Sequence, residues 1–213
     1  RVLFRSPSII MQSISSVMTF GMNKILIGFS ETAVAVFGVY FKLQSFIFMP
    51  IFGLNNGMIP IVAYNYGARS KKRIMETVWL SIGIAVGIML IGLMVFHLMT
   101  PQLLMLFQAD EEMLSIGVPA LRIISLSFLF AGYCIIVGSV FQALGNGVYS
   151  LIISVARQLV CILPLAWFFA RTFGLHAVWL SLPLAEITSV VLSSVLFRKI
   201  YLDKIKPLGQ PAA

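Results

Sequence analysis

Six apolar segments, each longer than about 20 residues, constrain this chain more than any other feature of its sequence. A helix of about 20 residues crosses the roughly 30 Å of hydrocarbon in a bilayer, because each residue rises about 1.5 Å. Hydrophobic residues make up 60% of the sequence and charged residues only 10%, which excludes an ordinary soluble domain. We therefore expect an all-α, polytopic membrane protein that folds as a bundle of six transmembrane helices. The expected helices are 7–29, 33–66, 74–99, 112–142, 149–171 and 175–200.

The basic residues gather at the start of the chain, in the loop after the second segment, and after the sixth segment. They are Arg1, Arg5, Arg69, Lys71, Lys72, Arg73, Arg198, Lys199, Lys204 and Lys206. If the helices alternate in direction, all three clusters lie on one side of the membrane, which the positive-inside rule predicts to be the cytoplasm. The net charge of +8 then indicates topology rather than a nucleic-acid partner. We expect a multi-pass protein of the plasma (cell inner) membrane, with both ends and the basic loops of this segment cytoplasmic.

No linker divides the chain, so we expect residues 1–206 to form one lobe. Residues 207–213, which include two prolines and a glycine, are expected to form a disordered tail. The chain begins at Arg1 rather than at a methionine and shows no leader peptide, and we expect an N-terminal portion to precede it.

The second segment is apolar, yet prolines and glycines interrupt it. Pro50, Gly53, Gly57 and Pro60 fall within eleven residues. A proline frees backbone groups that neighbouring helices, side chains or water must satisfy, so such a segment is typical of a cavity wall or a moving part. We interpret these four residues as a helix kink or hinge, and a kinked structural helix remains the alternative. The fourth segment is also longer than a membrane span needs, so we expect it to tilt, kink or project from the bilayer, which Pro119 and Gly132 can permit.

Three charged residues are expected near the membrane midplane. Lys42, Arg122 and Glu186 each lie about ten residues, or roughly 15 Å, from the outer end of their helix. A charge at this depth costs roughly 2.5–3.5 kcal/mol even on a lenient scale, so these side chains either pair with one another or form a site open to water. For Arg157, nearer the cytoplasm, the sequence favours a structural role.

Neutral polar residues form stripes on the apolar helices. The first segment aligns Gln12 with serine and threonine residues, and the second aligns Lys42 with Asn56 at helical spacing. Such stripes can join helices through hydrogen bonds. Because Gln12, Lys42, Asn56 and Glu186 overlap in depth, we favour a wet central cavity that forms a substrate or ion pathway. Phenylalanines, among them Phe41, could line it for flat aromatic cations.

Several short motifs resemble one family. The second segment contains Phe48-Met49-Pro50, Gly53-Leu54, Pro60-Ile61-Val62 and Asn65-Tyr66-Gly67-Ala68. This pattern looks like the eighth transmembrane helix of a multidrug and toxin extrusion (MATE) transporter. The flanking motifs agree, and they are Arg157-Gln158-Leu159-Val160, Pro164-Leu165-Ala166 and Pro183-Leu184-Ala185-Glu186.

The resemblance covers nearly all 213 residues but only the C-terminal half of such a transporter, which has two six-helix lobes. It implies an antiporter that exports drugs or organic cations in exchange for Na⁺ or H⁺ by alternating access, with the N-terminal lobe as partner and no cofactor. Some relatives carry an acid midway along the first helix of this lobe, about eight residues after a proline. Counted from Pro7, that position is Ser15, which places the coupling carboxylate in the other lobe or at Glu186.

Three other function classes compete with this interpretation. A lipid or polysaccharide flippase of the same superfamily shares the two-lobe architecture, and a non-transporting accessory subunit would use the polar stripes only to join helices. An intramembrane enzyme needs a nucleophile with a base, a carboxylate pair or a metal motif, and the sequence contains no GxSG or HExxH. Cys134 and Cys161 lie in apolar runs without a ligand pattern, so we expect packing roles and no metal site.

Overall fold

The computed structural model describes residues 2–209, and helices account for almost all of them. The described residues contain no strand. The elements are α1 (Val2–Leu26), α2 (Glu31–Gly67), α3 (Lys71–Leu98), α4 (Thr100–Met105), α5 (Glu111–Ser125), α6 (Phe128–Ala143), α7 (Gly147–Val155), the π-helical η1 (Ala156–Ile162), α8 (Leu163–Thr172), α9 (Leu175–Val178), α10 (Ser181–Ile200), the π-helical η2 (Tyr201–Ile205) and the 3₁₀-helical η3 (Lys206–Gly209).

The described helices are long and apolar enough for a membrane protein. Four helical stretches, Glu31–Gly67, Lys71–Leu98, Gly147–Thr172 and Leu175–Leu208, meet the length and hydropathy expected of a membrane span. The pair α5–α6 makes a fifth if its two helices count as one span, bent by 49°. The remaining long helix is α1, which carries the polar stripe and packs beside α7 and α8 within the same bundle.

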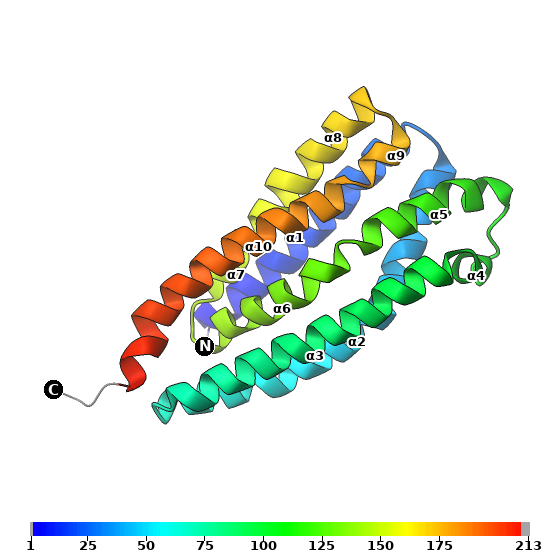
Figure 1. The fold of residues 1–213 in the computed structure, drawn as a ribbon. Coiled ribbons are helices and arrows are strands. Elements are labelled where there is room, and N and C mark those ends of the chain that lie inside the picture. Colours follow the sequence, from blue (N-terminus) through cyan, green and yellow to red (C-terminus); the bar gives the residue numbers. More distant parts are fainter. Residues whose placement is uncertain (1, 210–213) are drawn as a thin grey trace.

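The bundle is held together by close helix pairs (Figure 1). α3 packs against both α2 and α6, and α10 packs against α6 and η1. Gly132 permits the close approach of α6 to α3, because a Cβ at this position would lie 3.2 Å from the carbonyl carbon and oxygen of Ala85. Large side chains fill the interior, and Phe37, Phe96, Phe128 and Trp179 are almost completely buried.

Capping residues set where the helices begin. Ser30 accepts a hydrogen bond from the backbone N–H of Ala33 at 3.1 Å and starts α2. Asp110 accepts a hydrogen bond from the backbone N–H of Met113 at 2.8 Å and starts α5. The first turn of α5 carries two further acidic side chains, whose negative charge interacts favourably with the positive N-terminal end of the helix dipole. At the turn between α6 and α7, Gly145 has a φ of 78°, which side chains other than glycine rarely adopt.

The described parts of the basic clusters lie at one end of the bundle, as the sequence predicts. The start of α1, the α2–α3 loop, the α6–α7 turn and the end of α10 meet at this end, and α4 and α9 lie at the other (Figure 1). Lys204 ties two of these parts together, since its Nζ donates to the carbonyl oxygen of Leu144 at 2.9 Å and to Asn146 Oδ1 at 2.5 Å.

The structure differs from the sequence-based expectation in three places. The fourth segment bends at Leu126–Ser127, between α5 and α6, and not at Pro119 or Gly132, because each of those residues lies inside a continuous helix. The third segment ends at Leu98 and is followed by the separate short helix α4.

The third difference concerns the expected tail. Residues 207–209 continue the final helix as part of η3, and Leu208 packs against the hydrophobic core. The rest of the expected tail, residues 210–213, lies outside the described residues, as does Arg1.

The interrupted segment stays helical throughout. α2 runs without a break from Glu31 to Gly67 through both Pro50 and Pro60. Pro50, Gly53, Gly57 and Pro60 are spaced three or four residues apart and are all exposed, so they share one face of α2 that the rest of the lobe leaves uncovered.

Candidate functional site

Two neighbouring cavities lie between the helices. The first, here called the central cavity, has a volume of about 280 Å³ and is lined by residues of α1, α2, α6, η1 and α10, together with Ser127. The second, here called the basal cavity, has a volume of about 530 Å³ and is lined by residues nearer the basic end of the bundle, among them Gln12 and Gln142. Phe52, Ile135 and Arg157 line both cavities and therefore form the wall between them.

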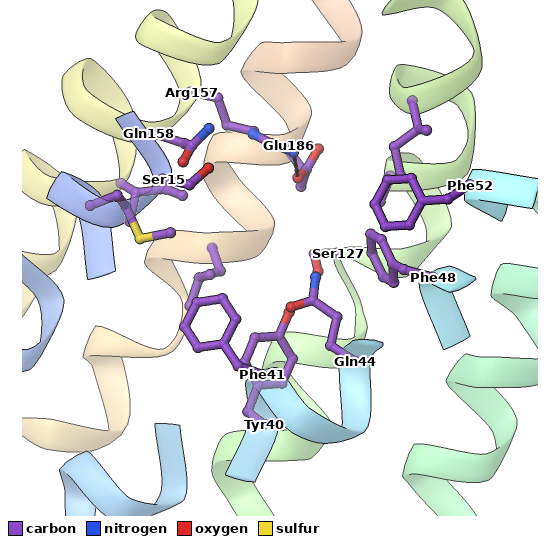
Figure 2. Close-up of a pocket in the computed structure, with 15 residues that line it drawn as sticks. Ser15, Tyr40, Phe41, Gln44, Phe48, Phe52, Ser127, Arg157, Gln158 and Glu186 are labelled. Atoms are coloured by element: carbon purple, nitrogen blue, oxygen red, sulfur yellow. Dashed lines mark hydrogen bonds and ion pairs between the residues drawn. The ribbon is translucent and has the colours of Figure 1, made fainter. Parts of the chain in front are cut away.

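An ion pair is part of this wall. Arg157 Nη1 donates to Glu186 Oε1 at 2.7 Å and links η1 to α10 (Figure 2). Glu186 is only 8% exposed, and it is the one acidic side chain among the buried polar residues of the described chain. Because a buried carboxylate without a partner costs several kcal/mol, pairing with the guanidinium offsets much of the cost of placing Glu186 at this depth.

Aromatic side chains of α2 form another wall of the central cavity. Tyr40, Phe41, Phe48 and Phe52 line it from one side of this helix (Figure 2). The rings are fixed by neighbours outside the cavity as well, and Phe48 meets Phe128 edge-to-face with ring centroids 5.6 Å apart. Together with the ion pair, they produce a cavity that offers flat apolar surfaces beside one carboxylate.

Several buried polar atoms around the two cavities have no hydrogen-bond partner within the described chain. They include Arg157 Nε, Glu186 Oε2, Gln158 Oε1 and Asn55 Oδ1. Each such atom in an apolar interior costs about 1–3 kcal/mol if it stays unpaired. The unused hydrogen-bonding capacity of these groups is therefore available to water, ions or a bound molecule in the cavities.

Only some of the residues predicted from the sequence to form the pathway line the two cavities. Glu186 lines the central cavity, and Gln12 and Asn56 line the basal cavity. Lys42 and Arg122 line neither of these two cavities. Lys42 is exposed with its Nζ 5.7 Å from the centre of the Phe107 ring, and Arg122 is also exposed. Glu186 thus pairs with Arg157 rather than with either of the two bases expected at its depth.

Arg157 and its neighbour Gln158 are the site residues whose importance the sequence analysis missed. Both lie in the π-helical turn η1, where the wider backbone changes the direction in which the side chains point. One signal was present in the sequence, since the only acid expected at midplane needed a base and Arg157 stands on a neighbouring helix.

Comparisons with known proteins agree with this architecture. A family model, MatE, matches residues 7–168. Among curated proteins, the chain is 27% identical to the multidrug export protein MepA of Staphylococcus haemolyticus over 180 residues, which are 84% of this chain and 39% of that protein. It is 26% identical to MepA of Staphylococcus saprophyticus over 93% of this chain and 44% of that protein. The chain therefore spans less than half the length of the curated relatives it matches.

Solved structures show the same half-length match. A MOP-superfamily transporter from Pyrococcus furiosus is 25% identical with a TM-score of 0.86, covering 96% of this chain and 46% of the other. An inward-facing MATE transporter is 24% identical, with a TM-score of 0.87 over 97% of this chain and 48% of the other. An outward-facing one is 25% identical, with a TM-score of 0.85 over 95% and 45%. Because the family model covers about three quarters of the sequence, the chain belongs to the MATE family of multidrug efflux transporters.

Proposed function

We propose that this chain is the C-terminal lobe of a secondary active antiporter that exports drugs or organic cations in exchange for Na⁺ or H⁺. The observation that carries this proposal is the central cavity, which combines aromatic walls with the buried Arg157–Glu186 pair. Aromatic faces attract organic cations through their negative quadrupole, and a nearby carboxylate adds to this attraction. The curated relatives are named as multidrug export proteins, which supports the same function here.

The partner of this lobe is the N-terminal six-helix lobe. The central cavity holds about 280 Å³, which is below the range of roughly 300–1,000 Å³ typical of drug-sized ligands. A second lobe across the exposed face of α2 would supply the missing walls. The fold of this lobe matches both an inward-facing and an outward-facing transporter, which supports alternating access by movement of one lobe relative to the other.

Glu186 is the candidate for ion coupling within this lobe. Its Oε2 is buried and without a partner, while its Oε1 is held by Arg157. A free carboxylate oxygen beside a cavity can accept a proton or contribute a ligand to Na⁺. Since Ser15 stands where some relatives carry an acid, a coupling carboxylate other than Glu186 would belong to the N-terminal lobe. The basic end of the bundle faces the cytoplasm by the positive-inside rule.

Dye efflux by the full-length protein tests the proposal. We expect Glu186→Gln to reduce gradient-driven efflux by at least tenfold, because it removes the only buried acid among the described residues while keeping the shape of the side chain. Glu76→Gln is the matched control, since Glu76 is exposed and forms only a loose surface pair with Lys72 at 3.8 Å. Normal efflux by a well-expressed Glu186→Gln variant would remove Glu186 from the mechanism.

Lys42→Ala provides a second test, of the expectation that Lys42 belongs to the pathway. Lys42 lies outside both cavities of this lobe, on α2, so a role in transport would act through the second lobe. We expect reduced efflux of cationic dyes at normal expression. Unchanged efflux would exclude Lys42 from the pathway. If the wild-type protein moves a fluorescent lipid and no dye, the flippase alternative replaces the antiporter.

A further inference from the structure

The basal cavity differs from the central cavity in chemistry. Eight of the sixteen described residues that line it are polar but neutral, including the amides Gln12, Asn55, Asn56 and Gln142. Arg157 is the one charged residue among the described residues that line it, and none of them is acidic. Glu186, which pairs with Arg157, does not line this cavity, so a cation here would meet no carboxylate of the lining, whereas an anionic group would meet a guanidinium and several amide donors.

Arg157 has N–H donors that Glu186 does not engage. Glu186 engages its Nη1 through a single contact of 2.7 Å, and its Nε is buried without a partner. Asn55, which lines the same cavity, is only 7% exposed and has an unpartnered amide oxygen. An amide can present either its oxygen or its NH₂ group to a ligand by rotating, so Asn55 can donate to an acid as well as accept from water.

We propose that the basal cavity is a subsite for the carboxylate of transported compounds, which Arg157 binds with the help of the surrounding amides. The planar guanidinium presents several N–H donors in a fixed geometry that matches a carboxylate, and such charge-assisted hydrogen bonds are stronger in a water-poor environment. The inference rests on the proposed export function. It narrows the substrate class to amphoteric aromatic compounds, whose ring system occupies the central cavity and whose acidic group reaches Arg157.

The position of Arg157 supports a ligand that extends through both cavities. Arg157 lines the central cavity and the basal cavity, as do Phe52 and Ile135, so the shared wall is formed by few side chains. If Arg157 served only to neutralise Glu186, an acidic group on a transported compound would not change its affinity for the protein. The two interpretations therefore differ in what they predict for a pair of compounds that differ only in an acidic group.

Two dyes provide this comparison, because rhodamine 123 is the methyl ester of rhodamine 110. Rhodamine 110 carries a free carboxylate and rhodamine 123 does not, while the aromatic cation is the same. The affinity of purified, full-length protein for each dye is measured by fluorescence anisotropy without an ion gradient. We expect the wild-type protein to bind rhodamine 110 more tightly, by on the order of tenfold, as one hydrogen bond to a charged group would give.

Variants of the ion pair then test the role of Arg157. The double variant Arg157→Gln/Glu186→Gln removes both charges without leaving one unpaired, and we expect it to lose the preference for rhodamine 110. Glu186→Gln alone releases the guanidinium, so the preference is expected to be retained or increased. Arg171→Gln is the control, because Arg171 lies over the Trp167 ring at 4.5 Å and lines neither cavity.

Should the double variant fail to fold, Arg157→Lys serves in its place, since it keeps the charge but loses the planar donor group. It is expected to reduce the preference several-fold. Equal affinities of the wild-type protein for the two dyes, no binding of rhodamine 110, or the same affinity ratio in wild type and the Arg157 variants would overturn the proposal. Loss of ion-driven efflux alone would count against the antiporter function and not against this subsite, because the affinities are measured at equilibrium.

Discussion

Stiffening α2 at its two central glycines should slow transport without harming the fold. A Cβ at Gly53 or at Gly57 would meet no atom of this lobe within 4 Å, so alanine at either position costs nothing in packing here. Alanine is favoured over glycine in a helix interior by about 1 kcal/mol. The variant Gly53→Ala/Gly57→Ala therefore stabilises the continuous helix by about 2 kcal/mol relative to a bent form in which both positions leave the helix, which corresponds to a factor of about 30 in the equilibrium between these two forms.

The assay compares initial rates of dye efflux by the full-length protein in proteoliposomes. If bending of α2 between Pro50 and Pro60 limits transport, the double variant is expected to be slower by up to this factor of about 30. Gly38→Ala is the matched control, because Gly38 lies in the same helix, also has open space at its Cβ position, and is outside the proline segment.

Thermal unfolding of the same variants separates stiffening from steric damage. A melting temperature equal to or above that of the wild type is expected, since alanine favours the helix. A lowered melting temperature would mean that the N-terminal lobe packs directly against the glycines. Efflux of the double variant at the rate of Gly38→Ala, with an intact fold, would refute the hinge interpretation.

Three further predictions concern the stability of the lobe. Gly132→Val should destabilise the protein by about 1–3 kcal/mol through overpacking against the Ala85 backbone, as measured by thermal unfolding, whereas Gly87→Val, with open space at its Cβ, should not suffer this clash. Equal losses for the two variants would contradict the close approach of α3 and α6. Asp110→Ala removes the cap of α5 and should cost about 1 kcal/mol, with faster hydrogen exchange in the first turn of that helix. Unchanged exchange there would argue against the cap. Lys204→Met removes two hydrogen bonds to the α6–α7 turn and should increase proteolysis of this turn in detergent. The absence of any change in cleavage would show that the turn is held by other contacts.

The partner of Glu186 shows where reasoning from the sequence reaches its limit. Counting residues from helix ends gives depth, and it placed Lys42, Arg122 and Glu186 at a common level. Depth does not say which face of a helix meets which neighbour, and Lys42 and Arg122 are exposed. Arg157 reaches Glu186 because η1 packs beside α10, and because its side chain is long enough to span a difference in depth.

The position of the bend in the fourth segment also could not be predicted from the sequence. Proline and glycine were expected to produce it, yet Pro119 lies within α5 and Gly132 serves close packing in α6. The helix instead bends at Leu126–Ser127, where the backbone N–H of Ser127 donates a hydrogen bond to the carbonyl oxygen of Ile124 at 3.0 Å. Which of these residues marks the bend depends on the side chains and helices that pack around each of them.

The sequence by itself determined the class of the protein, because hydrophobic length, charge placement and local motifs act through the bilayer and through neighbouring residues. These features predicted an all-helical lobe of a MATE transporter with its basic loops at one end. Only the tertiary structure decided that Arg157 pairs with Glu186, and that aromatic and amide side chains line two adjoining cavities. Such groupings join residues far apart in the chain, and they depend on the rotation and packing of whole helices, which local patterns do not specify.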